Sequence, residues 1–282
     1  MIYKITENGD GLKIKEYLRQ KGYSYTAVKR LKKYKGQLTV GGVPAYADFL
    51  LKNGDILEIS EAETNASSVT PIDMPLVIVY EDEYLLMIDK PPYLATLPTK
   101  KHYNNSLANG VAAYMQRNGV QDFIFRAINR LDADTSGLLA VAKKNFVQHA
   151  LQGKIKKTYF LAADGIIENA GEITLPISDD KELKKRRVCD GGAESCTRYT
   201  PVKYGKAMTG VLAEAVTGRT HQLRVHFAAI GHSIVGDTKY GKPSADITRQ
   251  ALHSYRMEFL HPITGEAMDI VCKVREDIEK LF

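Results

Sequence analysis

Residues 128–141 constrain the fold most, because a short polar loop here leads directly into a continuous apolar run. Arg130 and Asp132 lie two positions apart, and the turn residues of 134–137 follow them. An apolar run of this length, bounded by turn residues, is typical of a buried strand. The pattern therefore predicts a carboxylate on a loop supported by a rigid strand, where catalytic groups are commonly found. The alternative is an ordinary turn in which Asp132 and Asp134 only bond the backbone.

Two further segments place polar side chains within strand and helix patterns. One strand pattern includes Tyr159, which is either a core aromatic side chain or a functional one. Residues 211–216 predict another strand, and a glycine separates it from a helix that begins near Thr220. On this helix Arg224 is a neighbour of His221.

The loop resembles the signature loop of the RluA-type pseudouridine synthases, His-Arg-Leu-Asp-x-x-Thr-Ser-Gly. The match runs from Arg130 to Gly137, and Asn129 stands in place of the family's histidine. Asparagine cannot become cationic as histidine can, so Asn129 is expected to alter substrate preference while catalysis is retained.

Two other motifs extend this resemblance along the chain. The family motif Lys-x-Tyr-x-Ala is matched at Lys157 and Tyr159, with Leu161 in place of the alanine. The longer motif Gly-Arg-Thr-His-Gln-Leu-Arg-Val-His is matched at every position of residues 218–226. Few of the residue types in this motif are common enough to match by chance. The matched segments together are spread over most of residues 76–262.

The resemblance implies isomerisation of uridine in structured RNA, without a cofactor. The N1–C1′ bond breaks, the uracil rotates, and C5 joins C1′. Asp132 would attack C1′ or remove the C2′ proton, and both paths stay open. Arg224 is the implied partner that holds Asp132 ionised and oriented. The target base must leave its stack, so Arg130 is expected to fill the vacated place and Tyr159 to pack on the uracil or take the C5 proton.

The same resemblance implies further substrate-binding residues, with Leu252 as a wall of the base pocket. The others are Arg219 and His221. One rival is a catalytically inactive RNA-binding protein, against which Asp132, Tyr159 and Arg224 argue. The other is a metal-dependent phosphodiesterase, but His221 and His226 are five apart rather than the four that place two ligands on one helical face. No metal ligands are expected, and the histidines are predicted to bond loops and backbone.

Positive charge is concentrated near the N-terminus. Residues 1–60 hold 11 Lys and Arg against 6 Asp and Glu, whereas the rest of the chain holds 28 against 27. The basic positions that we expect to contact RNA lie on a predicted second helix, and they are Lys29, Arg30, Lys32 and Lys33. The alternative is a solvated helix face. The segment also resembles the small RNA-binding domain of ribosomal protein S-four. Large-subunit ribosomal RNA is the favoured substrate, and transfer RNA stays open.

The predicted class is α+β, with a mixed, largely antiparallel sheet, and it is taken from the resemblance. The expected organisation is a small basic RNA-binding domain at 1–60, a polar linker at 61–75 and a catalytic domain at 76–282. No apolar run approaches the roughly 20 residues of a membrane helix, and the N-terminus lacks a signal-peptide pattern. Three cysteines fit reduced thiols. We therefore expect a cytoplasmic monomer that does not enter a membrane.

Overall fold

The structure is a computed structural model that describes residues 2–23, 25, 28–29, 31, 38–59, 69–99, 104–121, 123–180 and 185–282. Among the basic residues predicted on the second helix, Lys29 is described and is exposed. Arg30, Lys32 and Lys33 lie outside the described residues, as does most of the predicted linker. No helix in the described ranges is long and apolar enough to cross a membrane.

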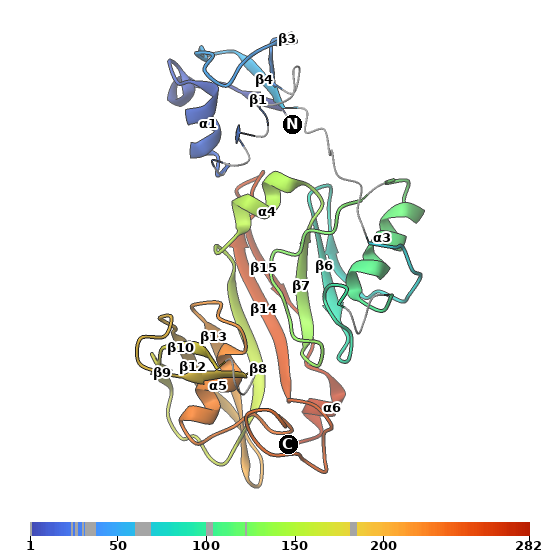
Figure 1. The fold of residues 1–282 in the computed structure, drawn as a ribbon, viewed down its shortest axis with the longest axis vertical. Coiled ribbons are helices and arrows are strands. Elements are labelled where there is room, and N and C mark those ends of the chain that lie inside the picture. Colours follow the sequence, from blue (N-terminus) through green and yellow to red (C-terminus); the bar gives the residue numbers. More distant parts are fainter. Residues whose placement is uncertain are drawn as a thin grey trace.

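A small unit precedes the larger one in the chain, and it lies beside α4 in Figure 1. Its helix α1 (Ile14–Gln20) buries Ile14, Tyr17 and Leu18, the spacing of one helical face. The described strands pair antiparallel in the order β1 (Ile2–Lys4), β4 (Ile56–Ile59), β2 (Leu38–Val40) and β3 (Val43–Pro44), and the 3-10 helix η1 (Glu7–Gly9) follows β1.

The larger unit is built on one long sheet that runs along the molecule (Figure 1). Among its described strands, only the β7–β14 pair is parallel, so the predicted α+β class with a mixed, largely antiparallel sheet is confirmed. In sheet order the strands are β5 (Ile78–Glu81), β6 (Leu85–Lys90), β7 (Ser136–Ala142), β14 (Leu252–Leu260), β8 (Lys156–Asp164), β13 (Met208–Ala215), β12 (Thr197–Tyr204) and β9 (Gly171–Ile173), with β15 (Ala267–Val271) paired to β14.

The remaining elements flank this sheet. A separate hairpin joins β10 (Ile177–Asp180) to β11 (Lys185–Val188). The helices are α3 (Leu107–Arg117), α4 (Asn145–Leu151), α5 (Gln222–Ala229) and α6 (Glu276–Glu279). Helix α4 ends at Leu151, two residues before Gly153, whose φ of +74° is a left-handed conformation that a helix cannot contain.

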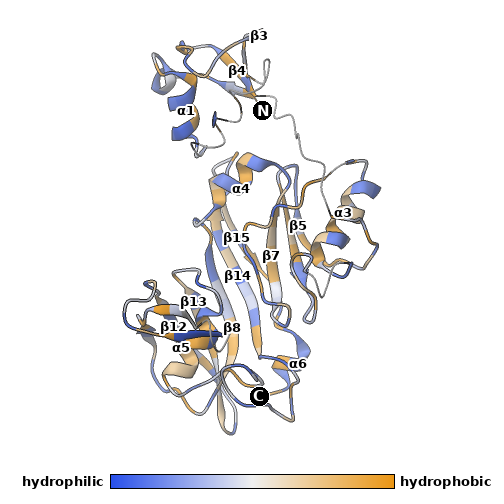
Figure 2. Cartoon of the chain, in the orientation of Figure 1, coloured by the Kyte–Doolittle hydropathy of each residue, from blue (hydrophilic) through white to orange (hydrophobic). Residues whose placement is uncertain are grey.

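The sheet is covered on both faces, which explains the continuous apolar run after the polar loop. Every residue of β7 is buried. Leu138 and Ala140 pack in one hydrophobic cluster, whereas Leu139 and Val141 pack in the other. Successive side chains of a strand point to opposite faces, so a strand buried on both sides is apolar throughout. Figure 2 shows this hydrophobic colouring along β7.

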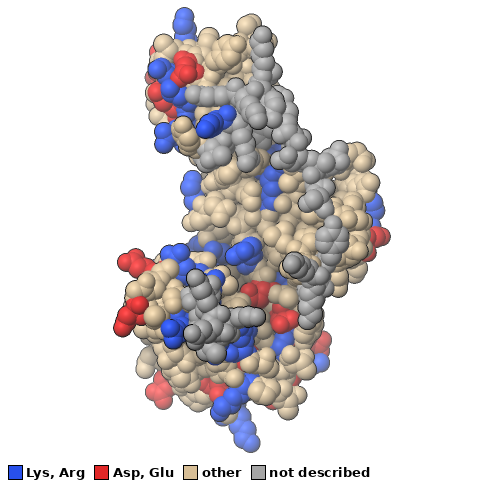
Figure 3. Space-filling view, viewed as in Figure 1, with Lys and Arg blue, Asp and Glu red and all other residues tan. Residues whose placement is uncertain are grey.

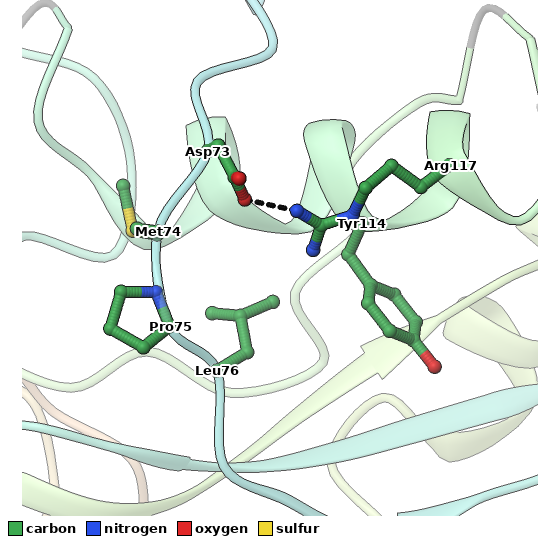
Figure 4. A pocket seen from close by; sticks show the side chains of 6 residues that line it. All are labelled: Asp73, Met74, Pro75, Leu76, Tyr114 and Arg117. Carbon is green, nitrogen blue, oxygen red and sulfur yellow. Dashed lines mark hydrogen bonds and ion pairs between the residues drawn. The ribbon is translucent and has the colours of Figure 1, made fainter.

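The end of the predicted linker lies along α3. Asn109 donates a hydrogen bond to the carbonyl of Thr70 and accepts one, through its own carbonyl, from the amide of Ile72. Asp73 forms an ion pair with Arg117. Figure 4 shows the shallow groove that results, and it is lined by Asp73, Met74, Pro75, Leu76, Tyr114 and Arg117. Residues 70–76 thus pack against the larger unit, and the predicted domain boundaries stay predictions.

Candidate active site

Arg224 joins two carboxylates at the centre of the candidate site. Its Nη1 donates to Asp132 Oδ2 at 2.8 Å. Its Nε and Nη2 donate to the two oxygens of Asp237 at 2.6 and 2.8 Å. The Asp237 side chain is fully buried, whereas the Asp132 side chain is 31% exposed. Asp237 is therefore a structural counter-ion, and Asp132 is the carboxylate that a substrate can reach.

Asp237 was missed as a functional residue by sequence reasoning. Burial by itself would raise the pKa of Asp237, but the hydrogen bonds and charge of Arg224 hold this pKa below its ordinary value. The backbone amides of Lys239 and Tyr240 also donate to Asp237 Oδ1. The sequence did hold a signal for it. An arginine on a buried helix face needs a structural counter-ion in addition to the carboxylate that faces the substrate.

Buried side chains hold the backbone of the catalytic loop, which we define as residues 130–135. Lys90 Nζ donates to Ala133, Thr96 Oγ1 to Leu131 and Arg249 Nη1 to Asp134, at 2.9, 2.9 and 3.1 Å to the three carbonyl oxygens. Burial lowers the pKa of Lys90 to about 7. The loop around Asp132 is therefore fixed by contacts on both sides of the carboxylate, before any substrate binds.

Gly137 explains the tight turn that brings this loop onto the sheet. Its φ is +102°, and a Cβ at this position would lie 2.3 Å from the carbonyl oxygen of Ser254. The parallel pairing of β7 with β14 at Ser136 and Gly137 depends on this close approach. The pairing places the loop next to Leu252, the buried first residue of β14.

Asn129 has a different place from the one expected. It is buried, its Nδ2 donates to the carbonyl of Leu138 at 3.3 Å, and its Oδ1 accepts from the amide of Ala140 at 2.8 Å. The two polar groups of the Asn129 amide thus bond the backbone of β7, in the way that the backbone of a neighbouring strand would. This position favours a structural role in anchoring the loop, and the expected effect of Asn129 on substrate preference stays a prediction.

His221 links Asp132 to Tyr240. His221 is the N-cap of α5 with φ 56°, and its Nε2 lies 3.7 Å from Asp132 Oδ2. Its Nδ1 is 2.8 Å from the hydroxyl of Tyr240, which accepts a hydrogen bond from the backbone amide of Arg186. Burial lowers the pKa of His221, so the imidazole is neutral at physiological pH. The Tyr240 ring also stacks on Arg224, 5.2 Å from the guanidinium carbon to the ring centroid.

Tyr159 lies beside Asp132 in the middle of the sheet. It is buried on β8, and Leu252 is paired with Leu161 two positions further along that strand. Burial, and then the negative charge of Asp132, raise the pKa of the Tyr159 hydroxyl above its ordinary value. The phenol therefore stays protonated at neutral pH.

The remaining predicted substrate-binding residues lie towards the solvent. Arg130 is exposed on the catalytic loop. Arg219 is exposed just before α5, and its Nε donates to the carbonyl of Glu194 at 3.0 Å. Lys29 belongs to the small N-terminal unit. The structure thus brings Asp132, Arg224, His221, Tyr159 and Leu252 together and leaves Lys29 on a separate unit.

The four other histidines of the last third of the chain serve as hydrogen-bonding groups, as the sequence predicted. His226 bonds to Ser195, Thr197 and the carbonyl of Leu175. His253 bonds to Ser136, His232 to the carbonyl of Asp164, and His261 to Asp82. Among the residues that the structure describes, no group of three or more His, Cys, Asp or Glu could hold a metal ion.

The charges around the site suit an anionic polymer. Figure 3 shows acidic side chains near the middle of the viewed face, where the lower parts of β7 and β14 lie in Figure 1. Lys and Arg side chains surround them on this face (Figure 3). Basic groups around a carboxylate site favour a phosphate backbone at the edge while the carboxylate faces the reacting sugar.

Comparison with known proteins gives a consistent result. The family described as RNA pseudouridylate synthase matches residues 84–229. The chain is 34% identical over 277 residues to the uncharacterized RNA pseudouridine synthase YjbO of Bacillus subtilis, covering 95% of this chain and 98% of the relative. It is 32% identical over 254 residues to the ribosomal large subunit pseudouridine synthase D of Zymomonas mobilis, covering 83% and 80%. The solved human RNA pseudouridylate synthase domain containing 1 has a TM-score of 0.58 and 25% identity, covering 71% of this chain and 83% of that one.

Proposed function

Because the chain belongs to the RNA pseudouridylate synthase family, we propose that Asp132 isomerises specific uridines in structured RNA at the site described above. The enzyme is an RNA pseudouridine synthase. The observation that carries the assignment is the 2.8 Å hydrogen bond from Arg224 to Asp132, whose second oxygen and exposed edge stay available to substrate. A positioned arginine fixes the direction of the carboxylate through a charge-assisted hydrogen bond.

The chemistry needs one ionised carboxylate and no redox step. When the N1–C1′ bond breaks, its electron pair stays on the uracil, and positive charge develops at C1′. Asp132 either forms a C1′–O bond or accepts the C2′ proton, and both paths neutralise that charge. The uracil then turns and its C5 bonds to C1′, while the C1′–O bond to Asp132 breaks on the first path and Asp132 returns the proton to C2′ on the second. C5 finally loses its proton and N1 gains one, so the product is an isomer of the substrate.

Tyr159 fits a packing role better than a proton-accepting one. Its hydroxyl is protonated at neutral pH, since burial and the charge of Asp132 raise its pKa. A protonated phenol is a poor acceptor for the C5 proton unless it passes its own proton to another group. We therefore assign Tyr159 and Leu252 to the walls that hold the flipped uracil beside Asp132.

The proposed substrate is large-subunit ribosomal RNA. Support comes from relatives of similar length that are named ribosomal large subunit pseudouridine synthase D. The small N-terminal unit, which we propose binds RNA as the domain of ribosomal protein S-four does, would add a second contact on a large folded RNA. Arg130 is proposed to fill the place of the flipped base. Transfer RNA stays an alternative, and the monomeric state and cytoplasmic location stay predictions.

Two rival functions make different predictions. A catalytically inactive RNA-binding protein would not need Asp132, Arg224 and Asp237 joined in one buried ion-pair network. A metal-dependent phosphodiesterase would need Asp132 to face other ligands, but the carboxylate is bonded to a guanidinium instead.

The test is conversion of uridine in unmodified transcripts by the purified protein, with and without a chelator. We expect pseudouridine at defined positions, no cleavage of the RNA, and equal rates in both conditions. RNA that is bound but unchanged would support the inactive binding protein. Cleavage that the chelator abolishes would support the phosphodiesterase.

A further inference from the structure

Tyr93 has a left-handed backbone conformation that packing in the core does not explain. Among the described residues, the non-glycine residues with positive φ are Tyr93, at 63°, and His221, which belongs to the active site. Residues with a Cβ rarely adopt this conformation, and it persists where the surrounding structure or a function requires it. The Tyr93 side chain is not buried, because the residue is 54% exposed. The ring therefore stabilises the core little, although it occupies a position suited to glycine.

The hydroxyl of Tyr93 is anchored, so the ring has a fixed direction. It forms a 2.6 Å hydrogen bond with the side-chain hydroxyl of Thr248, which is 155 positions away in the chain. A ring that is fixed at both its backbone and its hydroxyl loses little side-chain entropy when a ligand packs on it.

Tyr93 lies at the edge of the catalytic loop. The next residue, Leu94, accepts a hydrogen bond from Lys90 Nζ at 2.8 Å, and the same Nζ donates to Ala133 of the loop at 2.9 Å. The residue after Thr248 is Arg249, whose Nη1 donates to Asp134 at 3.1 Å. The Tyr93–Thr248 bond thus connects two segments that each hold the loop, one at Ala133 and the other at Asp134, directly after Asp132.

We propose that the exposed face of the Tyr93 ring is a stacking platform for an RNA base that neighbours the target uridine. This inference rests on the proposed function, because it needs an RNA strand at Asp132. Removal of one base from a stack leaves its neighbours unstacked, and single-stranded or splayed bases are commonly held on aromatic side chains. Stacking does not depend on base identity, so the platform contributes affinity and positioning rather than sequence readout.

The competing explanation is that the Tyr93–Thr248 bond only fastens two loops. Three variants separate the two roles. Tyr93→Phe keeps the ring and removes the bond, whereas Tyr93→Gly removes both and relieves the positive φ. Tyr204→Ala is the matched control, since Tyr204 is 55% exposed at the end of β12.

The experiment measures binding and turnover separately. The Kd for an unmodified large-subunit ribosomal RNA transcript is measured for each variant in the Asp132→Asn background, with a transfer RNA transcript as a second arm. Single-turnover rates at saturating and limiting RNA are measured with Asp132 intact. Thermal midpoints are compared throughout.

We expect Tyr93→Gly to weaken binding of the substrate transcript about tenfold, as loss of one stacking contact does. Its rate at saturating RNA should stay within about twofold of wild type, and its thermal midpoint should not fall because a strained backbone is relieved. Tyr204→Ala should bind as wild type does, and Tyr93→Phe should weaken binding less than Tyr93→Gly does, because it keeps the ring but loses the bond that orients it.

Unchanged binding by Tyr93→Gly would overturn the platform. So would equal losses for Tyr93→Phe and Tyr93→Gly, because the hydroxyl bond would then carry the effect. A wild-type protein that binds the transcript but forms no pseudouridine would contradict the proposed function instead, and the binding comparison would still test the platform.

Discussion

The floor and the rim of the active site differ in how their side chains are satisfied. We define the floor as Lys90, Arg224, Asp237 and Arg249, all of which are buried and bonded within the protein. The rim consists of the exposed Tyr93 and Arg130. The floor can fix Asp132 before RNA binds, whereas the exposed rim side chains can form new contacts when RNA binds. Floor variants should therefore change stability and kcat, and rim variants should change KM.

The largest expected effect concerns Asp237 in the floor. Asp237→Asn leaves the buried Arg224 without its bidentate carboxylate, so the free energy of unfolding should fall by about 3–5 kcal/mol. Denaturant titration measures this change. Asp269→Asn is the matched control, because Asp269 also pairs bidentately with an arginine but is exposed, and its loss should change stability far less. Equal losses in the two variants would erase the distinction between buried and exposed pairs.

His253 extends the floor to the opposite face of the sheet and gives a pH dependence. Burial lowers the pKa of His253 to about 4. The negative charge of Asp89 raises this pKa, whereas the positive charges of Arg275 and Arg249 lower it further. The unfolded histidine has a pKa near 6.5, so the unfolded state binds more protons between these values. Stability is therefore complete above about pH 6.5 and falls as the pH drops to 4, by about 3 kcal/mol in total.

Thermal or denaturant unfolding at several pH values measures this contribution. His253→Gln should flatten that part of the profile, since glutamine does not titrate. An unchanged slope in His253→Gln would assign the acid sensitivity to other groups.

Lys90 tests whether the floor positions the loop. Lys90→Met removes the donor to the carbonyls of Pro91, Leu94 and Ala133. Each carbonyl left unsatisfied costs about 1–3 kcal/mol, and the loop is expected to relax around Asp132. The rate at saturating RNA should fall about tenfold or more, while RNA binding is retained. A change in KM alone would place Lys90 with the rim.

Arg130 is expected to give the smallest effect on the protein itself. Arg130→Ala removes an exposed side chain, so the free energy of unfolding should change by no more than about 0.5 kcal/mol. KM should rise about tenfold, because the place of the flipped base is no longer filled. Steady-state kinetics measure this, with the exposed Arg198→Ala on β12 as control. A large loss of stability in Arg130→Ala would contradict the division into floor and rim.

The sequence indicated the class of fold and the central pair of the site. The period and length of the apolar runs predicted the strands, and the resemblance paired Asp132 with Arg224, which are joined in the structure. These features are carried by local patterns and by motif residues, so they are readable along the chain.

Contacts between distant segments could not be read in this way. Asp237 and Tyr240 complete the site around Arg224 from a loop, and Lys90 reaches the catalytic loop from a strand 43 positions earlier. The bonds of Asn129 are a further example, because its place in the motif did not indicate that its amide bonds the backbone of β7. Residue type and spacing do not reveal which way a side chain points once the sheet has formed.

The central claim is that Asp132, held by Arg224, isomerises uridine. The most direct test is pseudouridine mapping of total RNA from cells that lack this protein, complemented with wild type, Asp132→Asn or Asp134→Asn. Asp134 lies on the same loop and controls for loss of a carboxylate there. We predict that defined uridines lose the modification in the deletion and with Asp132→Asn, and regain it with wild type and Asp134→Asn. Full modification in cells carrying Asp132→Asn would contradict the account.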